Sequence, residues 1–300
     1  MSIVSFVKIQ GTTRDSFKKA ISESLDLISY KFGEEVKKVV LKPNLCYYWD
    51  YSTGQTTDPA FVAAIIEKLR EILPYSKTTI SIVESDASAM KCKHAFKMLG
   101  YEKLSRDYNV ELVNLSEDSC VPTDVVVNNQ IFHFSMPCTI QNADLKINIP
   151  KIKYTTEKLG ITCALKNIYG CNPNPKKSRY HSRVEEVIVA LNKAMKFDLC
   201  LIDGIIVSGI QPRKLGLVMA SEDPVAIDVA AAQVAGVKPE KKRCLHLAHA
   251  EGLGNLSFTP RGMPLGYFRD RYPRKDFQKK FLTSAYSLIT HIGLNKKIGL

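Results

Sequence analysis

The chain has 300 residues, of which 45% are hydrophobic, and its formal net charge is +12. This length and composition allow a full core, as one large α/β domain or two closely joined lobes, and they exclude a disordered or low-complexity protein. The sequence shows neither a secretory leader at residues 1–19 nor a run of about 18 apolar residues, so we expect a cytoplasmic protein.

Short β-rich runs alternate with longer helical patterns over residues 1–115. This alternation predicts an α/β fold with a doubly wound, mostly parallel sheet and helices on both faces. The expected strands are residues 3–9, 38–41, 79–84 and 110–115, and the expected helices are residues 15–32, 59–73 and 92–100.

The middle of the chain is less regular before the α/β pattern resumes. Residues 125–134 predict a hairpin that turns at Asn128 and Asn129, although this turn lacks the usual glycine. Further on, we expect helices at residues 183–195 and 224–235 and strands at residues 198–204 and 215–220, the first of them ending in a turn at Gly204. The predicted α/β core therefore covers residues 1–258.

Residues 259–300 are predicted to form a basic C-terminal extension. Prolines interrupt its first part, and residues 276–292 then show an amphipathic helix pattern with lysines opposite the apolar face. Such a helix packs on its own domain, on a second copy in a homo-oligomer, or on an anionic membrane as a peripheral contact. The positive charge is also compatible with nucleic acid, but no nucleic-acid-binding motif accompanies it, so we do not expect that partner.

A lysine and an asparagine follow an apolar run in two stretches far apart in the chain, residues 39–44 and 161–170. We expect both to lie at neighbouring ends of one sheet, because ligands of open α/β sheets bind beyond the carboxyl ends of the strands. Glu84, Asp86, Lys151, Asp203 and Ser221 are also expected at such ends. The predicted residues for binding a small anionic ligand are Lys42, Asn44, Thr56, Thr57, Lys151, Asn167 and Lys177.

Several of these residues have a simpler structural interpretation. Thr56 and Thr57 precede Asp58 and Pro59, a pattern that caps a helix with or without a ligand contact. Lys166, if buried, needs a polar partner. That partner is either a structural salt bridge, to Asp203 or Asp228, or a phosphate, carboxylate or metal-bound substrate.

The predicted catalytic residues are His181, Lys166 and Asp203. Lys177, Arg179 and Arg183 flank His181 and favour its neutral form, which serves as an acid/base or a metal ligand; a plain surface histidine is the alternative. Asp203 or Asp228 is expected to orient a lysine or to bind a cation.

The eight cysteines contain no CxxC pair, so no local zinc or iron–sulfur motif is present. Most are interpreted as reduced structural thiols. An assembled metal ion or iron–sulfur cluster held by Cys46 and Cys171 remains an alternative, and it would imply a redox partner protein. His246 and His249 also have a spacing that can bind a metal. The chain contains no GxGxxG, GxxxxGK[ST], GxSxG or HExxH motif, which removes the simplest enzyme classes.

An ordered series of short motifs resembles the family called domain of unknown function 362. The series comprises Lys42-Pro43-Asn44, Thr56-Thr57-Asp58-Pro59, Ala143-Asp144, Pro150-Lys151, Gly160-Ile161-Thr162, Lys166-Asn167-Ile168-Tyr169-Gly170, Lys177 with His181, Asp203-Gly204, Ser221 to Asp228 and Gly252-Leu253-Gly254. The resemblance implies an α/β fold in a family whose larger members often carry ferredoxin-like iron–sulfur modules. This chain lacks those cysteines and the histidine that commonly follows the lysine matching Lys151.

These patterns favour an enzyme that binds a phosphate- or carboxylate-bearing substrate or cofactor in a cleft lined by lysine and asparagine. Two other classes stay open: a metal or iron–sulfur redox protein, and a binding protein that docks through its basic tail.

Overall fold

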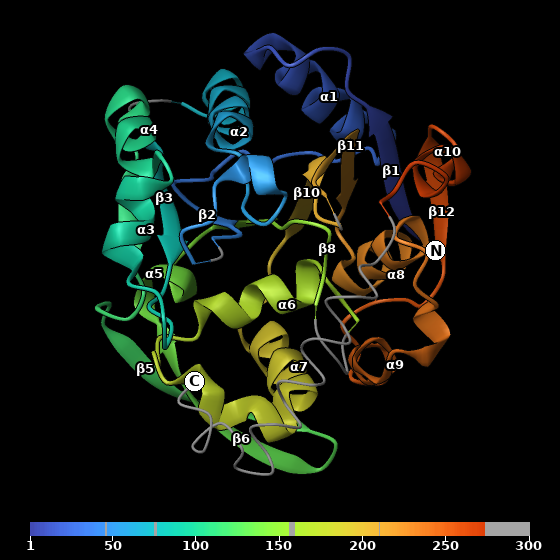
Figure 1. Ribbon diagram of the computed structural model, residues 1–300. Coiled ribbons are helices and arrows are strands. Elements are labelled where there is room, and N and C mark those ends of the chain that lie inside the picture. Colours follow the sequence, from blue (N-terminus) through green and yellow to red (C-terminus); the bar gives the residue numbers. More distant parts are fainter. Residues whose placement is uncertain (46, 75–76, 156–159, 210, 274–300) are drawn as a thin grey trace, which may run out of the picture.

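An eight-stranded sheet forms the centre of the protein in the computed structural model, which describes residues 1–45, 47–74, 77–155, 160–209 and 211–273 (Figure 1). The strand order is β12-β1-β11-β10-β7-β2-β3-β4. Pairing is parallel throughout except on both sides of β11, so β11 alone in this sheet runs in the opposite direction. The strands are β1 (Ser2–Lys8), β2 (Lys38–Pro43), β3 (Thr79–Glu84), β4 (Glu111–Asn114), β7 (Leu145–Ile149), β10 (Leu199–Val207), β11 (Arg213–Ser221) and β12 (Phe258–Gly262).

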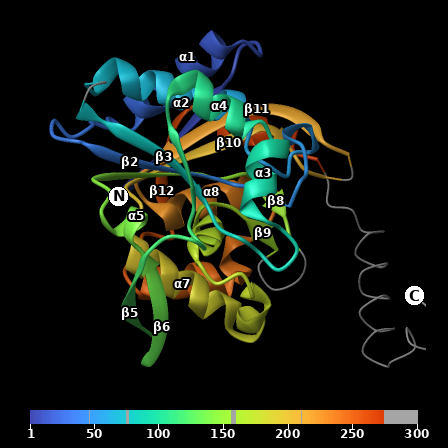
Figure 2. The same ribbon diagram turned by 90° about the vertical axis from the view of Figure 1, so that its left-hand side faces the viewer.

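Helices cover both faces of this sheet, as the sequence predicted (Figure 2). One face carries α1 (Arg14–Leu27), α2 (Pro59–Ile72), α3 (Cys92–Met98) and α4 (Tyr101–Tyr108). The other carries α6 (Ala164–Ile168), α7 (Val184–Met195), α8 (Pro224–Val234) and α9 (Arg243–Ala250). Successive strand residues face opposite cores: Val39 and Leu41 pack toward α1 to α4, whereas Val40 packs toward α7. This two-sided burial explains why the strands are continuous apolar runs.

Two long helices begin where the sequence predicted. Asp58 caps α2, accepting a hydrogen bond from the Ala60 amide at 2.8 Å, and Pro59 occupies the first helical position. Asp223 caps α8 in the same way through the Val225 and Ala226 amides, again followed by proline. A proline at this position loses nothing, because the first amides of a helix have no partner within it.

The predicted hairpin is confirmed. Strands β5 (Cys120–Val127) and β6 (Gln130–Pro137) pair antiparallel, and the two residues between them, Asn128 and Asn129, have φ angles of 47° and 58°. A two-residue turn of this kind requires positive φ at both positions. Asparagine tolerates that conformation better than other non-glycine residues, so the turn forms without glycine.

The second Lys-Asn stretch does not end a strand of the main sheet, which corrects the prediction. Ile161–Thr162 forms β9, which pairs with β8 (Lys153–Tyr154) in a separate small sheet, and the chain then enters α6. Asp228 accepts hydrogen bonds from the Ala164 and Leu165 amides at 2.6 and 3.1 Å and so satisfies the first turn of α6. Lys166 and Asn167 therefore lie on a short helix that packs over the sheet.

Two other strand ends differ from the prediction. Strand β10 continues past Gly204 to Val207 with an irregularity between Gly204 and Ile206, so Asp203 lies inside the strand and not at a terminal turn. Ser221 ends β11, but because β11 runs antiparallel it pairs with Cys200, near the start of β10. Ser221 is consequently at the opposite edge of the sheet from Lys42.

The remaining elements complete the described chain. Strand β12 pairs with β1, so residues just beyond the predicted boundary at 258 belong to the sheet. Short helical segments are α5 (Cys138–Gln141), α10 (Leu265–Arg269), η1 (Tyr51–Thr53), η3 (Tyr169–Cys171), η4 (Lys177–Arg183) and η5 (Pro239–Lys241). The predicted amphipathic helix at 276–292 lies outside the described residues. Among those that are described, no helix is long and apolar enough to cross a membrane.

Candidate functional site

Buried charged side chains gather near the carboxyl ends of the parallel strands β2, β3, β7 and β10. We call this side of the sheet its carboxyl edge. Lys42 is the residue before the end of β2, and Glu84 ends β3. Lys151 follows β7 and forms a parallel bridge with Asp203 of β10. Parallel pairing brings these positions to one edge, and Lys42, Lys151, Glu84 and Asp203 are all 3% exposed or less. Charges buried this deeply need partners.

Lys42 and Glu84 form one buried ion pair. The Lys42 Nζ donates to Glu84 Oε2 at 2.8 Å and to the Pro43 carbonyl at 2.7 Å. Glu84 also accepts the Ser85 amide at 2.9 Å. The ammonium and the carboxylate therefore neutralise each other, and Lys42 does not offer a free charge to a ligand.

Lys151 and Asp203 form a second buried ion pair, with 3.0 Å between Lys151 Nζ and Asp203 Oδ1. The other oxygen of Asp203 accepts the Asp58 amide at 2.9 Å, which ties the start of α2 to β10. Burial and, after it, the negative charge of Asp203 together raise the pKa of the Asp58 carboxyl to about 6. The prediction that Asp203 orients a lysine agrees with this pairing.

Asparagine side chains form a buried hydrogen-bond network that reaches the backbone of Lys42. Asn44 Nδ2 donates to Asn167 Oδ1 at 2.8 Å, and Asn167 Nδ2 donates to the Lys42 carbonyl at 3.0 Å and to Asn148 Oδ1 at 2.8 Å. Lys153 Nζ donates to Asn44 Oδ1 at 2.7 Å and to the Gln55 carbonyl at 3.0 Å. Asn44 and Asn167, predicted as ligand contacts, thus also bind one another and join α6 to the sheet.

The two threonines before α2 differ in their partners. Thr57 Oγ1 accepts the Asn44 amide at 2.8 Å and donates to the Ile149 carbonyl at 2.8 Å, so its role is structural. Thr56 is 1% exposed, and its hydroxyl has no hydrogen-bond partner among the described residues. A buried hydroxyl without a partner costs about 1–3 kcal/mol, so this oxygen is the kind of group that a ligand can satisfy.

Lys177 is a buried lysine for which the described residues supply no carboxylate partner. Its Nζ donates to Ser85 Oγ at 2.6 Å and to the Gly170 carbonyl at 3.4 Å, both uncharged acceptors. Burial lowers the pKa of Lys177, and the nearby charge of Lys42 adds to the effect, while the Glu84 carboxylate opposes it. Gly170 also lies against the Lys42–Glu84 pair, since a Cβ there would lie 3.0 Å from both Lys42 Nζ and Glu84 Oε1.

The other predicted catalytic and metal residues are less tightly connected to this cluster. His181 is exposed near the end of η4 and makes no hydrogen bond or ion pair with another described residue. Lys166 is half-buried on α6. Cys171 is buried, and burial raises the pKa of its thiol to about 12. Cys46 lies outside the described residues, among which no group of three or more His, Cys, Asp or Glu could hold a metal ion.

Sequence reasoning placed Glu84 at this edge but missed its pairing with Lys42, and it missed Ser85, Asn148 and Lys153. A signal for two of them exists: Asn148 lies two residues before Pro150 in a buried strand, and Lys153 follows Lys151 at the two-residue spacing of a strand. Ser85 carries no comparable signal, because only the fold brings Lys177 to it.

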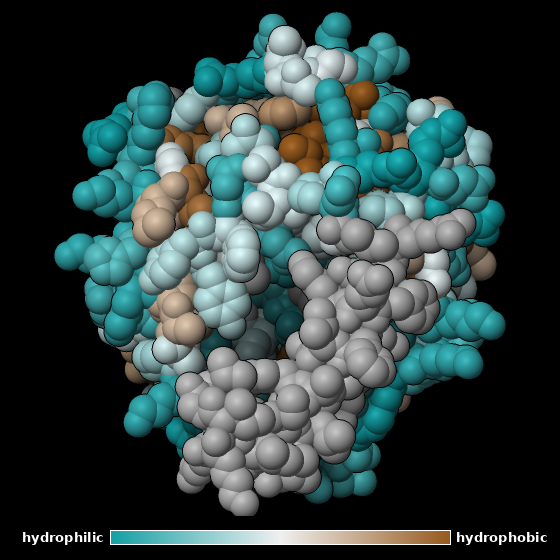
Figure 3. Space-filling model, viewed as in Figure 1, coloured by the Kyte–Doolittle hydropathy of each residue, from teal (hydrophilic) through white to brown (hydrophobic). Residues whose placement is uncertain are grey.

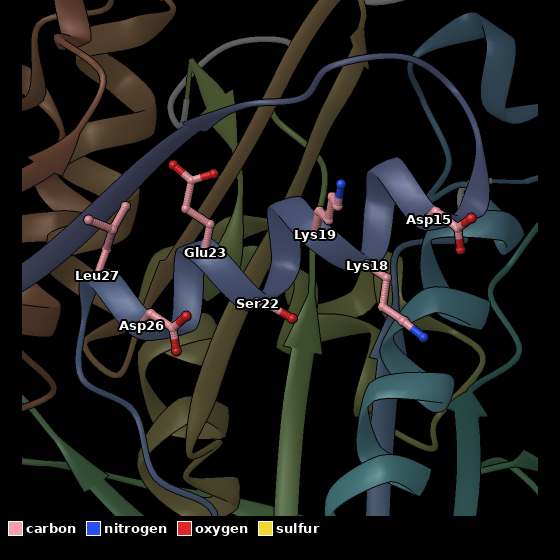
Figure 4. Close-up of a pocket in the computed structure, with 7 residues that line it drawn as sticks. All are labelled: Asp15, Lys18, Lys19, Ser22, Glu23, Asp26 and Leu27. Atoms are coloured by element: carbon pink, nitrogen blue, oxygen red, sulfur yellow. The ribbon is translucent and has the colours of Figure 1, made fainter.

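Figure 3 shows hydrophilic residues near the middle of the view, over the region where Figure 1 draws α6. A pocket of about 780 Å³ lies elsewhere, along α1, with the side chains of Figure 4. Its charges, Lys18 and Lys19 against Asp15, Glu23 and Asp26, are solvent-facing and mixed in sign, so this pocket is separate from the buried site.

The fold and this edge define an α/β protein with a buried cluster of lysine, carboxylate and asparagine at the carboxyl ends of a mostly parallel sheet. The model of the family described as Domain of unknown function (DUF362) matches residues 39–233, and the chain belongs to that family. The chain is also 27% identical over 215 residues to the Thylakoid-associated protein sll1697 of Synechocystis sp.. The match covers 67% of this chain and 64% of that relative.

Proposed function

We propose that this protein is an enzyme that binds a small phosphate- or carboxylate-bearing ligand at the carboxyl edge of the sheet, with Lys177 as the group that meets the ligand's charge. The observation that carries the proposal is the state of Lys177, which is buried and hydrogen-bonded to neutral oxygens only. Lys42 and Lys151 are buried more deeply, at 0% and 1% exposed against 9% for Lys177, but each already has a carboxylate. Lys177 therefore differs from Lys42 and Lys151 because no described carboxylate pairs with it.

An anionic group near Lys177 would restore the charge balance that burial disturbs. The ammonium form of a desolvated lysine is destabilised, which lowers its pKa, and an adjacent anion stabilises it again. The same poised state suits proton transfer, because a lysine with a lowered pKa exchanges its proton closer to neutral pH. Lys177 is thus suited both to hold an anion and to act as an acid or base on it.

Other residues have supporting roles in this proposal. Lys42 with Glu84 and Lys151 with Asp203 fix the framework, while the unpaired Thr56 hydroxyl is a candidate ligand contact. Ser85 positions Lys177 through its 2.6 Å hydrogen bond. Lys166 and His181 remain proposed contacts, since α6 and η4 carry them on either side of Gly170 in the chain.

The test compares Lys177→Met with Lys176→Met, a neighbouring change of the same charge at an exposed lysine. Binding of inorganic phosphate and of oxalate is measured by calorimetry, with urea unfolding as a control for folding. We expect Lys177→Met to lose at least about tenfold in affinity, which is about 1.4 kcal/mol, and Lys176→Met to bind as the wild type does. Equal binding by both variants contradicts the proposal.

The pH dependence of binding gives a second readout. The ammonium form must be present to attract an anion, so affinity should fall as pH rises through the lowered pKa of Lys177. This fall should be absent in Lys177→Met. Mass spectrometry of the denatured wild-type protein identifies any co-purified anion, which then serves as the substrate to be tested for turnover.

A peripheral membrane contact is a second candidate function, favoured by the name of the relative, which is described as thylakoid-associated. The basic composition of residues 259–300 fits attraction to an anionic lipid surface. Co-sedimentation with vesicles, with and without anionic lipid, tests it in the full chain. Binding that ignores lipid charge would argue against an electrostatic contact through this segment.

A further inference from the structure

Three aromatic side chains are exposed on one short loop next to the site. Tyr47, Trp49 and Tyr51 follow β2 and are 49%, 55% and 38% exposed. Among the described residues they are the aromatic side chains classed as exposed, whereas the others are buried or half-buried. Large aromatic surfaces left in water within a five-residue segment call for a partner.

This aromatic loop begins and ends in the site. Its two ends are joined by reciprocal hydrogen bonds, from the Asn44 amide to Thr57 Oγ1 at 2.8 Å and from the Thr57 amide to the Asn44 carbonyl at 2.9 Å. Lys153 holds the loop at the Gln55 carbonyl. The negative charge of Asp58, which caps α2 just after the loop, raises the pKa of the Tyr51 hydroxyl.

Hydrogen bonds and close packing hold the loop in a defined shape. Asp50 caps the Tyr51–Thr53 turn through the Ser52 amide at 2.9 Å, and Tyr48 Oη accepts the Lys91 amide at 2.9 Å. Gly54, with φ of 71°, lies against β10 so closely that a Cβ would come within 2.5 Å of the Ser208 amide nitrogen. The backbone of residues 48–54 is therefore fixed at several points, and it carries the exposed Trp49 and Tyr51.

The start of the loop belongs to the buried network. Asn44 Nδ2 donates to Asn167 Oδ1 at 2.8 Å, and the Asn44 amide donates to Thr57 Oγ1. The loop therefore leaves the sheet beside the buried cluster. A ligand with a charged end and a flat apolar end suits this arrangement.

We propose that Tyr47, Trp49 and Tyr51 form a stacking wall for a ring carried by the ligand, so that the substrate class is an aromatic or heterocyclic phosphate or carboxylate. This inference rests on the proposed function, because it requires an anionic group held near Lys177. Aromatic side chains stack on any flat π-system and bury it with little loss of side-chain entropy, since a tyrosine or tryptophan has two rotatable angles. The anion supplies attraction, and the ring supplies selectivity.

The chain offers a direct reporter, because Trp49 is its single tryptophan. Intrinsic fluorescence of the native protein therefore reports on this loop. The probes are matched pairs that differ in the ring: phenyl phosphate against methyl phosphate, and benzoate against acetate. We expect the ring-bearing member to bind about tenfold tighter or more and to change Trp49 emission, whereas the ring-free member binds without that change.

Variants separate this inference from the proposed function. Tyr47→Ala and Trp49→Ala should lower the preference for phenyl over methyl phosphate toward one, while methyl phosphate binding, measured by calorimetry, is kept. Met98→Ala, at an exposed apolar residue of α3, is the matched control and should leave the preference unchanged.

Three results would overturn the inference. If phenyl and methyl phosphate bind equally, the stacking wall is wrong and the anion site stands. If neither binds, the proposed function fails with it. If the rings give no preference but anionic lipid vesicles shift Trp49 emission, the exposed aromatics are a membrane contact and not a ligand wall.

Discussion

The carboxyl edge of the central sheet and the amino edge, where the parallel strands begin, carry charge in different ways. At the amino edge, exposed aspartates accept backbone amides of the neighbouring strand: Asp144 binds the Lys37 and Lys38 amides at 2.9 and 2.8 Å, and Asp198 binds the Lys146 amide at 2.7 Å. At the carboxyl edge, the charged groups are lysines and carboxylates removed from water. The arrangement at the amino edge satisfies backbone amides at a small desolvation cost, because the aspartate carboxylates remain exposed to water.

The family motif that contains Asp223 lies at the amino edge, away from the candidate site. Asp223 caps α8 and also accepts Ser2 Oγ at 2.6 Å and the Asn255 amide at 2.8 Å. A Cβ on Gly254 would overlap the Asp223 carboxylate, so the Gly252-Leu253-Gly254 stretch must approach without a side chain at its last position. These residues hold the fold together. An acidic family motif can thus serve the structure, whereas we propose a ligand for the buried Lys177.

The largest effect should come from breaking a buried pair at the carboxyl edge. Lys42→Met leaves the Glu84 carboxylate buried without its cation, and we expect the free energy of unfolding to fall by about 3–5 kcal/mol. Urea unfolding measures it. The double variant Lys42→Met/Glu84→Leu should recover most of the loss, because it removes both charges. A double variant as unstable as the single one would show that hydrogen bonds, and not charge, hold this edge.

A smaller effect concerns Asp58, whose pKa is raised to about 6. A carboxyl that holds its proton more tightly when folded loses stability as pH rises from its unfolded pKa, about 4, to its folded one. The wild type should therefore lose up to about 3 kcal/mol between pH 4 and 6 through this group. Asp58→Asn keeps an oxygen to cap α2 and should lack this decline in urea unfolding across that range. An unchanged pH profile would mean that Asp58 titrates normally.

The smallest effect is expected at the amino edge. Asp144→Ala removes an acceptor from two amides that water can reach, so the free energy of unfolding should fall by about 1 kcal/mol. Those amides hold the pKa of Asp144 below its usual value, so its contribution is present above that value and disappears as pH falls through the lowered pKa. Acid titration of unfolding, with Asp144→Ala beside the wild type, checks the sign. A loss as large as that of Lys42→Met would erase the difference between the edges.

Hydrophobic periodicity predicted the helices that bury one apolar stripe and the strands that form one continuous apolar run. The α2 and α8 starts were clear because Asp-Pro fixes a capped first turn, and the Asn128-Asn129 hairpin was clear because both residues tolerate positive φ. The 161–170 stretch was misplaced for the converse reason. Its apolar run is too short to distinguish a strand from a helix, and the decision came from Asp228, distant in sequence, which caps α6.

The sequence by itself determined the α/β class, the family motifs and most residues of the carboxyl-edge cluster, because each follows a local apolar run that must be buried. Only the tertiary structure decided how the lysines divide. Lys42 pairs with Glu84 and Lys151 pairs with Asp203, whereas Lys177 donates to Ser85 and Gly170 and has no carboxylate within the described part of the chain. Which lysine meets a carboxylate depends on which strands become neighbours, and the depth of burial then sets the energy of each pair. The local sequence encodes neither the neighbours nor the burial.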